Sequence, residues 1–249
     1  MIQDLHSHTY YSLCGYNRPE AVVEAAIEGG IELLGICDHN HGIMHGRRCV
    51  RNSQCDLEFD DCERTFRRYF DHIDLIREKY ADKIKILRGI EISTHKDGPR
   101  NTLPDNADVS FFDYCLIENL DRGSDSVTEG DLFAYADRLA IPAVGIAHTD
   151  MFAFIEKLGE DPYRYFKRMA DRGIFWEMNV SYDSTHKYRQ HGYMLRFFED
   201  SEQQAIVRES GVRLSIGFDG HRVEDYLADR VADYCRRVEN LGIKMAFEP

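Results

Sequence analysis

Seven short runs, six of them mainly apolar and the first (IQDL) mixed, alternate along the chain with longer polar or amphipathic segments, and this alternation limits the fold more than any other feature. The runs have the length and composition of β-strands, and we place them at residues 2–5, 31–37, 83–92, 111–118, 142–148, 173–179 and 212–219. The segments between them predict helices at residues 19–29, 60–80, 129–140, 161–172, 192–210 and 223–241. Repeated strand–helix units build a parallel sheet covered by helices, either open or closed as a barrel.

The chain is long enough for one large α/β domain, and nothing in it marks a boundary. Its 249 residues contain no linker rich in proline, glycine or serine and no internal repeat, so we expect a single domain over residues 1–249. No apolar run has the length needed to cross a bilayer, and no basic segment followed by an apolar one opens the chain. Seven cysteines, an odd number, fit free thiols in a reducing compartment. We therefore expect a cytoplasmic protein without a membrane partner.

The net charge of −13 argues against a general affinity for nucleic acid, which requires a basic surface. It does not exclude a small anionic substrate, because divalent cations bound in an acidic pocket reverse the local electric field. The charge therefore favours a small molecule bound through metal ions over a polynucleotide.

Histidines and acidic residues lie at the carboxyl end of nearly every predicted strand. His6 and His8 would point to the same side of an extended chain, although a His-x-His pair by itself fits a pair without a ligand equally well. The other residues at these ends are Asp38, His39, Glu91, Glu118, His148, Asp219 and His221. Because the carboxyl ends of parallel strands meet on one face of a barrel, these side chains should converge. Imidazole and carboxylate ligands suit Zn, Mn or Fe, and so many donors predict more than one ion, with Glu91 bridging two of them.

Five short motifs in a fixed order resemble the polymerase and histidinol phosphatase (PHP) family of phosphoesterases. They are HSHT, CDHN, GIEI, AHTD and FDGH, and they extend from His6 to His221. The resemblance implies an α/β fold, a distorted, TIM-like βα barrel of seven strands, with two or three divalent metal ions at the strand ends.

The resemblance also implies how the ligands divide among the ions. One ion would be held by His6, His8, Glu91 and Asp219, a second by Glu91 and His148, and a third by His39 and His221. Asp38 would either bind an ion or orient a neighbouring ligand, as carboxylates behind a metal site do.

The sequence departs from the family pattern at two places. Many members carry a histidine after the fourth strand, where this chain has CLIENLD, so Glu118 either replaces that ligand or leaves the second ion more weakly held. Some members have a further ligand shortly after the His-x-His pair, where this chain has Cys14. A thiolate ligand and a packed thiol are both open interpretations of that cysteine.

The expected site predicts hydrolysis of a phosphate ester. A metal-bridged water has a lowered pKa and is a hydroxide nucleophile near neutral pH, so no serine or cysteine nucleophile is required. We assign catalytic roles to Glu91 and Asp38, and to His45, which lies in the polar segment after the second strand and would contact the substrate or transfer a proton. The resemblance points to histidinol phosphate as the substrate, and a nucleotide or a sugar or alcohol phosphate fits the same chemistry.

Cationic side chains are expected to bind the phosphate in addition to the metal ions. The polar segment after the sixth strand, NVSYDSTHKYRQHGY, is similar in place to a family loop that supplies a phosphate-binding arginine, and here Arg189 and His186 are the candidates. Arg18 precedes the first predicted helix, whose N-terminus would attract an anion. For each residue of the segment after the sixth strand, a position in a solvated loop is an equally good interpretation.

Three other functions fit parts of the pattern. A nuclease that trims DNA or RNA ends is disfavoured by the acidic balance of the chain. A metal-dependent amidohydrolase also begins with His-x-His, but the fourth strand, FFDYCLIE, lacks the metal-bridging lysine that such an enzyme needs. A catalytically inactive, metal-binding or regulatory subunit would have lost ligands, and most of the set is present. The sequence gives no sign of an oligomeric state.

Overall fold

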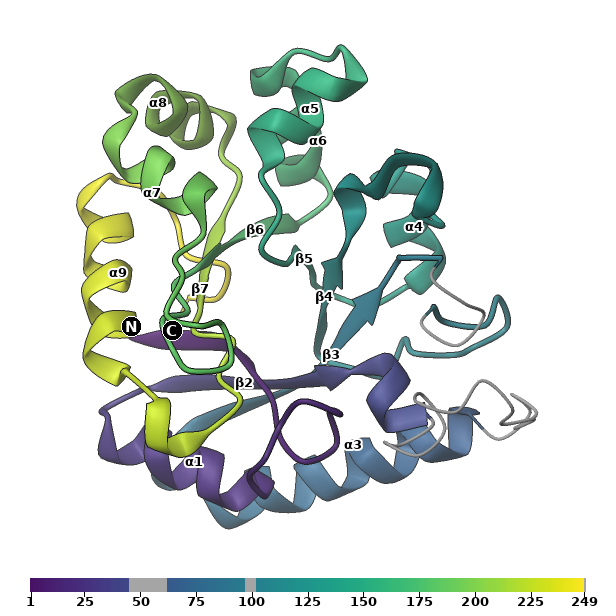
Figure 1. Cartoon of the computed structure of the whole chain (residues 1–249), viewed down its shortest axis with the longest axis vertical. Helices are drawn as coiled ribbons and strands as arrows, with labels where there is room; N and C mark the ends of the chain where they lie inside the picture. Colours follow the sequence, from purple (N-terminus) through teal and green to yellow (C-terminus); the bar gives the residue numbers. More distant parts are fainter. Residues whose placement is uncertain (45–61, 97–101, 249) are drawn as a thin grey trace.

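The computed structural model describes residues 1–44, 62–96 and 102–248, which contain seven parallel strands in one sheet (Figure 1). In chain order the strands are β1 (Gln3–Ser7), β2 (Leu33–His39), β3 (Lys85–Ser93), β4 (Tyr114–Glu118), β5 (Val144–Ile146), β6 (Ile174–Asn179) and β7 (Leu214–Gly217). Each strand pairs in parallel with the next one in the chain. Beyond β7 the chain returns to β1, where the N–H of His8 donates to the carbonyl of Gly220 at 2.9 Å. The sheet is therefore a nearly closed barrel, which confirms the predicted fold.

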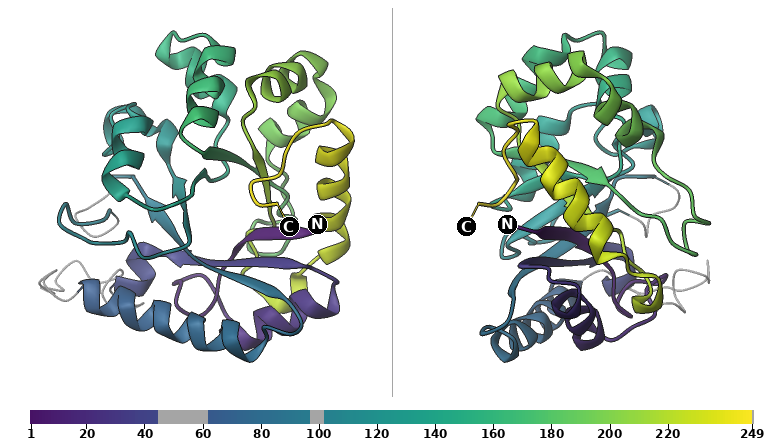
Figure 2. Two further views of the ribbon diagram at one scale, coloured as in Figure 1. Left: turned by 180° about the vertical axis from the view of Figure 1, so that it is seen from behind. Right: turned by 90° about the vertical axis from the view of Figure 1, so that its left-hand side faces the viewer.

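Helices surround the barrel on its outer side (Figures 1 and 2). They are α1 (Pro19–Glu28), α3 (Cys62–Lys79), α4 (Leu132–Leu139), α5 (Met151–Leu158), α6 (Pro162–Asp171), α7 (Gly192–Glu199), α8 (Ser201–Ser210) and α9 (Ala228–Asn240), with the short 3-10 helices η2 (Leu120–Asp125) and η3 (Val223–Asp225). Among the described residues, none of the helices is both long enough and apolar enough to cross a membrane.

The helices differ from the sequence prediction at two places. Residues 192–210, predicted as one helix, form α7 and α8, because Asp200 has non-helical backbone angles (φ −99°, ψ 101°) and its side chain caps α8. α5 has no counterpart among the predicted helices. Asp150 caps its start by accepting a hydrogen bond from the N–H of Ala153 at 3.1 Å, and Gly159 ends it in the left-handed region.

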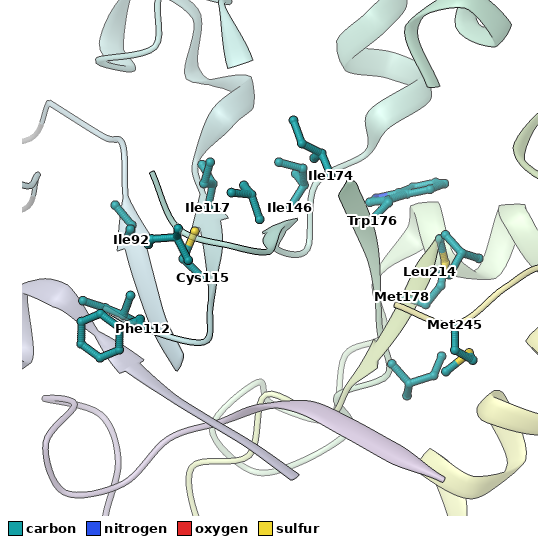
Figure 3. Close-up of a cluster of buried hydrophobic side chains, with 14 of the residues drawn as sticks. Ile92, Phe112, Cys115, Ile117, Ile146, Ile174, Trp176, Met178, Leu214 and Met245 are labelled. Atoms are coloured by element: carbon teal, nitrogen blue, oxygen red, sulfur yellow. The ribbon is translucent and has the colours of Figure 1, made fainter. Parts of the chain in front are cut away.

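Apolar side chains pack on both faces of the sheet. Inside the barrel, Leu116 and Phe175 belong to a small core, which the C-terminal segment closes with the ring of Phe247, 6.1 Å from that of Phe175. Outside the barrel, a larger core fills the space between the sheet and the helices. Figure 3 shows part of it, with Ile146 and Trp176 among the side chains that line this layer. The interior core occupies the amino end of the barrel and leaves the carboxyl end to polar side chains.

β1 contains an irregularity that decides which of its side chains face the interior. Asp4 and Ser7, three positions apart, pair with residues of β2 that are only two positions apart. The extra residue in β1 is a bulge, and it allows the adjacent residues Leu5 and His6 both to face inward. His6 thereby lies on the same side as His8, at the carboxyl end of the barrel.

Candidate metal centre

Polar side chains from the ends of different strands converge inside the carboxyl rim of the barrel. His6 and His8 come from β1 and the residue following it, Glu91 comes from β3, and Asp219 and His221 follow β7. All of them are buried, with exposed fractions between 0% and 5%. Buried histidines and carboxylates require partners, because burial of a charge without one is costly.

Four residues form a first group of candidate ligands, which we call the first set: His6, His8, Glu91 and Asp219. The Nε2 atoms of His6 and His8 lie 3.1 Å apart, and Nε2 of His8 lies 3.1 Å from Oδ1 of Asp219. Glu91 completes the group, with Oε1 3.3 Å from Nε2 of His6 and Oε2 3.4 Å from Nε2 of His8. Two imidazole nitrogens and two carboxylates so placed are a suitable ligand set for a divalent transition metal.

Glu91, Glu118 and His148 form the second set. Nε2 of His148 lies 3.2 Å from Oε1 of Glu91 and 4.0 Å from Oε2 of Glu118. Glu118 is the last residue of β4, and its other oxygen lies 3.6 Å from Nδ1 of His39. The glutamate that stands where many family members have a histidine therefore points into the centre.

His39, His221 and Cys14 form the third set, beside His8. The rings of His39 and His221 flank that of His8, at centroid distances of 4.5 and 4.4 Å. Burial would raise the pKa of the Cys14 thiol, but hydrogen bonds with His221 and His39 lower it to about 7. A lowered thiol pKa favours the ligand interpretation of Cys14 over that of a packed apolar thiol.

Two buried atoms at the centre show that a cation fits between these sets. Oε2 of Glu91 and Nδ1 of His39 lie 2.8 Å apart, yet neither makes a hydrogen bond. Buried polar atoms without a hydrogen bond are rare, and a cation that both atoms face would satisfy them. The donors present thus fit divalent metal ions.

The charges around Glu91 and His8 also suit metal binding. Burial would raise the pKa of Glu91, but the charges of His39 and His6 hold it well below its usual range. Burial lowers the pKa of His8, and the neighbouring His221 and His39 lower it further. Glu91 is therefore ionised and His8 neutral, which are the forms that bind a metal ion.

Asp38 lies behind the ligands. Its Oδ1 accepts hydrogen bonds from the N–H and the hydroxyl of Ser12 at 2.9 and 2.6 Å, and its Oδ2 accepts one from the hydroxyl of Thr9 at 2.8 Å. The hydroxyl oxygen of Ser12 accepts a hydrogen bond from the N–H of His39 at 2.9 Å and lies 2.9 Å from Nδ1 of His8. Of the two roles that the sequence leaves open for Asp38, the geometry favours orientation of the ligands.

Two polar residues of β6 reach the centre, although the sequence analysis does not predict either of them as a site residue. Oε1 of Glu177 lies 2.6 Å from Nδ1 of His6, and the side-chain amide of Asn179 donates to Oδ2 of Asp219 at 3.2 Å. Both residues are fully buried. The available signal is the strand sequence IFWEMN, in which a charged residue interrupts an apolar run and the next polar residue follows at the strand period of two.

The predicted substrate-binding residues lie at different depths. His186 faces the centre, with Nε2 3.1 Å from Oδ2 of Asp219. Arg189 lies in the same loop and is exposed, and Arg18 is exposed immediately before α1, whose N-terminus its side chain does not cap. His45 lies outside the described residues.

Comparisons with known proteins identify the family and the fold. The sequence model of a family described as PHP domain matches residues 4–169. That segment contains the first four of the five motifs, up to AHTD, and the FDGH motif follows it. No curated protein matches the chain.

Two solved structures resemble the whole chain. The first is a histidinol phosphate phosphatase from Lactococcus lactis subsp. lactis Il1403, complexed with zinc, L-histidinol and phosphate. It is 16% identical, with a TM-score of 0.54, and the match covers 98% of this chain and 94% of that one. The second, from Listeria monocytogenes, is provisionally assigned as a histidinol phosphatase; it is 16% identical, with a TM-score of 0.52 and coverage of 90% and 96%. At this level of identity the two structures show a shared fold.

Proposed function

The chain belongs to the PHP domain family, and on this premise we propose that it hydrolyses a small phosphate monoester with two or three divalent metal ions. Family membership makes it a metal-dependent phosphatase. The observation that carries the finer proposal is the position of Glu91. Its two carboxylate oxygens lie 2.8–3.4 Å from ring nitrogens of four histidines, so this one side chain can serve ions on either side.

The three sets described above would each hold one ion. In this assignment Glu91 belongs to both the first and the second set, Glu118 takes the place of a histidine in the second, and Cys14 contributes a sulfur to the third. Bound divalent ions lower the pKa of water and neutralise negative charge on a phosphate ester. Zn, Mn and Fe all suit such a mixture of nitrogen, oxygen and sulfur donors.

Residues of the loop after β6 would bind the phosphate. Burial would lower the pKa of His186, but hydrogen bonds with Asp183 and Asp219 raise it to about 10. In the metal-free protein His186 therefore carries a positive charge at neutral pH beside the proposed metal ligands, where an anionic ester must approach. Arg189, in the same loop, and Arg18, before α1, are the arginines that we propose for the outer contacts of the phosphate.

The nature of the alcohol is the open part of the proposal. The structure from Lactococcus lactis is in complex with L-histidinol and phosphate, so histidinol phosphate is one substrate to test. Nucleotides and sugar or alcohol phosphates are the others, because the same metal chemistry acts on any small phosphate monoester.

The test is hydrolysis of an aryl phosphate and of this substrate panel by metal-stripped protein supplied with Mn²⁺ or Zn²⁺. His8→Ala and Asp219→Asn should each reduce turnover on the order of 100-fold or more, since each removes a ligand. Asp113→Asn is the matched control, because Asp113 pairs with Arg88 at 2.6 Å at the opposite end of β4. Absence of metal-dependent turnover on every ester would overturn the proposal.

A further inference from the structure

Glu177 is a fully buried carboxylate that contacts metal ligands without belonging to a ligand set. It lies in β6, between the strands that carry His6 and His148. Its Oε1 faces Nδ1 of His6, whereas the atom of His6 that faces His8 and Glu91 is Nε2. A buried charge in this position must be satisfied by hydrogen-bond donors, and both of its oxygens have them.

The first oxygen of Glu177 fixes the imidazole of His6. Oε1 lies 2.6 Å from Nδ1, a short distance typical of a charge-assisted hydrogen bond. Accepting this hydrogen bond places the proton on Nδ1 and leaves Nε2, the atom that faces His8 and Glu91, free to bind a metal ion. Glu177 thereby sets both the tautomer and the orientation of a ligand in the first set.

The second oxygen of Glu177 acts on a ligand of the second set. Oε2 accepts a hydrogen bond from the backbone N–H of His148 at 2.7 Å. His148 has φ +24°, a left-handed conformation that residues other than glycine rarely adopt and that the surroundings must stabilise. The hydrogen bond holds the backbone that aims the His148 ring at Glu91.

A glycine on the neighbouring strand makes room for this carboxylate. A Cβ atom added to Gly217 would lie 2.1 Å from Oε1 of Glu177 and 2.6 Å from Cβ of His6. The side-chain amide of Asn179 reaches Oε2 of Glu177 at 3.4 Å and Oδ2 of Asp219 at 3.2 Å, which extends the connection to a third ligand. The missing side chain of Gly217 and the amide donor of Asn179 thus accommodate the carboxylate of Glu177.

We propose that Glu177 is a positioning residue that couples the first and second metal sites, by orienting His6 with one oxygen and His148 with the other. The inference rests on the proposed function, since it requires that these histidines bind metal ions. It predicts that one substitution in β6 weakens the binding of two ions.

Glutamine cannot replace Glu177, although it has the same shape. Its side chain offers one acceptor and one donor, whereas the imidazole Nδ1–H of His6 and the N–H of His148 are both donors. If the NH₂ group faces the N–H of His148, two donors meet at 2.7 Å. If it faces Nδ1 of His6, the ring accepts it only in the tautomer that carries the proton on Nε2, the atom that would bind the metal ion. Glu177→Gln therefore either breaks a hydrogen bond or blocks Nε2 of His6, with little change in volume.

The experiment measures the binding of Zn²⁺ to metal-stripped protein by competition with a chromogenic chelator. Glu177→Gln should weaken binding roughly 10- to 100-fold at two sites, and kcat for an aryl phosphate should fall by a similar factor with KM nearly unchanged. Asp113→Asn, the same chemical change at the other end of the barrel, should keep the wild-type binding constants. The inference would be overturned if Glu177→Gln bound Zn²⁺ with the wild-type binding constants, or if its Zn²⁺ binding were weakened at one site alone.

Two further measurements separate this inference from folding and from the proposed function. If Glu177→Gln fails to fold, Glu177→Asp keeps the charge but draws the carboxylate back by one methylene, and the same weakening at two sites is expected. Wild-type constants in that variant would refute the coupling. If the wild-type protein itself binds no Zn²⁺ and hydrolyses no ester, the proposed function fails, which is a different result from equal binding by wild type and variant.

Discussion

The second set of ligands should bind a divalent ion more weakly as the pH falls from about 9 to 7. Burial alone would lower the pKa of His148, but its hydrogen bond with Glu91 and the charge of that carboxylate raise the pKa to about 9. Without metal, the imidazole is therefore protonated at neutral pH. An imidazolium cannot bind a metal ion, so the ion competes with a proton for Nε2.

The loss of metal affinity can be calculated from the difference between the pH and this pKa. A pH of 7 is about two units below the pKa of His148. Removing the proton at that pH therefore costs about 2.7 kcal/mol, at about 1.36 kcal/mol per unit. The apparent affinity of the second set should thus fall about tenfold per pH unit well below this pKa, and about 50-fold between pH 9 and 7. Above pH 9 the dependence on His148 should vanish.

The same proton stabilises the metal-free protein, with the opposite dependence on pH. The pKa of His148 is higher in the folded state than the ordinary value of 6.5. Its contribution, about 3 kcal/mol, is therefore fully present below pH 6.5 and is lost as the pH rises through about 9. Chelated protein should lose stability over that interval, and metal-loaded protein should not, because its His148 carries no proton.

Titration calorimetry with Mn²⁺, in buffers that differ in ionisation enthalpy, measures both the affinity and the number of protons released. The pKa of His6 is also raised, because the charges of Asp219 and Glu177 outweigh burial, so the wild-type protein releases a proton there too. The difference between wild type and His148→Gln isolates His148 and should be close to one proton at pH 7. An affinity independent of pH between 7 and 9, with no difference in proton release, would refute the reasoning.

Three further outcomes are expected. Burial would raise the pKa of Cys14, but His221 and His39 lower it to about 7. Iodoacetamide should therefore alkylate Cys14 at pH 8 faster in chelated than in metal-loaded protein. Equal rates, measured by mass spectrometry, would argue against a thiolate ligand. Arg189→Ala should raise KM for a phosphate ester roughly tenfold or more while Zn²⁺ affinity stays constant, and an unchanged KM would remove this arginine from the phosphate contacts. Phe175→Ala should lower the free energy of unfolding by about 3–5 kcal/mol in a denaturant titration, because its ring fills the interior core; a loss below about 1 kcal/mol would contradict that packing.

The sequence predicts the barrel well because most of the strands are apolar runs buried on both faces; β1 (QDLHS) is buried but mainly polar. All seven predicted runs contain an observed strand or most of one, with ends displaced by a few residues. The helices are less well predicted where the deciding feature is a single cap. Asp200 divides one predicted helix into two, and Asp150 starts a helix of eight residues whose apolar pattern is too short to stand out.

The positions at the centre are harder to predict, because they depend on contacts between distant parts of the chain. His6, Glu91 and Asp219 can be placed at strand ends from the sequence, since histidine and acidic side chains in such positions are conspicuous. Glu177 is different, because it looks like an interruption of β6 until His6 and His148 are seen to donate to it. The role of Asp38 also emerges from its hydrogen-bond partners and not from its place in a motif.

Regular strands alone would not build this centre, since alternate residues of a parallel strand face the helices. Three departures from regular strand geometry bring ligands to the rim: the bulge in β1, which turns His6 inward, and left-handed residues at His148 (φ +24°) and Asp219 (φ +57°) just beyond β5 and β7. Each is held by a hydrogen bond from another element. The N–H of Asp219 donates to the carbonyl of His6 at 2.7 Å, and that of His148 donates to Glu177. The backbone cost of these departures is therefore offset by neighbouring strands: the positions of His6 and Asp219 depend on closure of the barrel between β7 and β1, and that of His148 on the neighbouring β6.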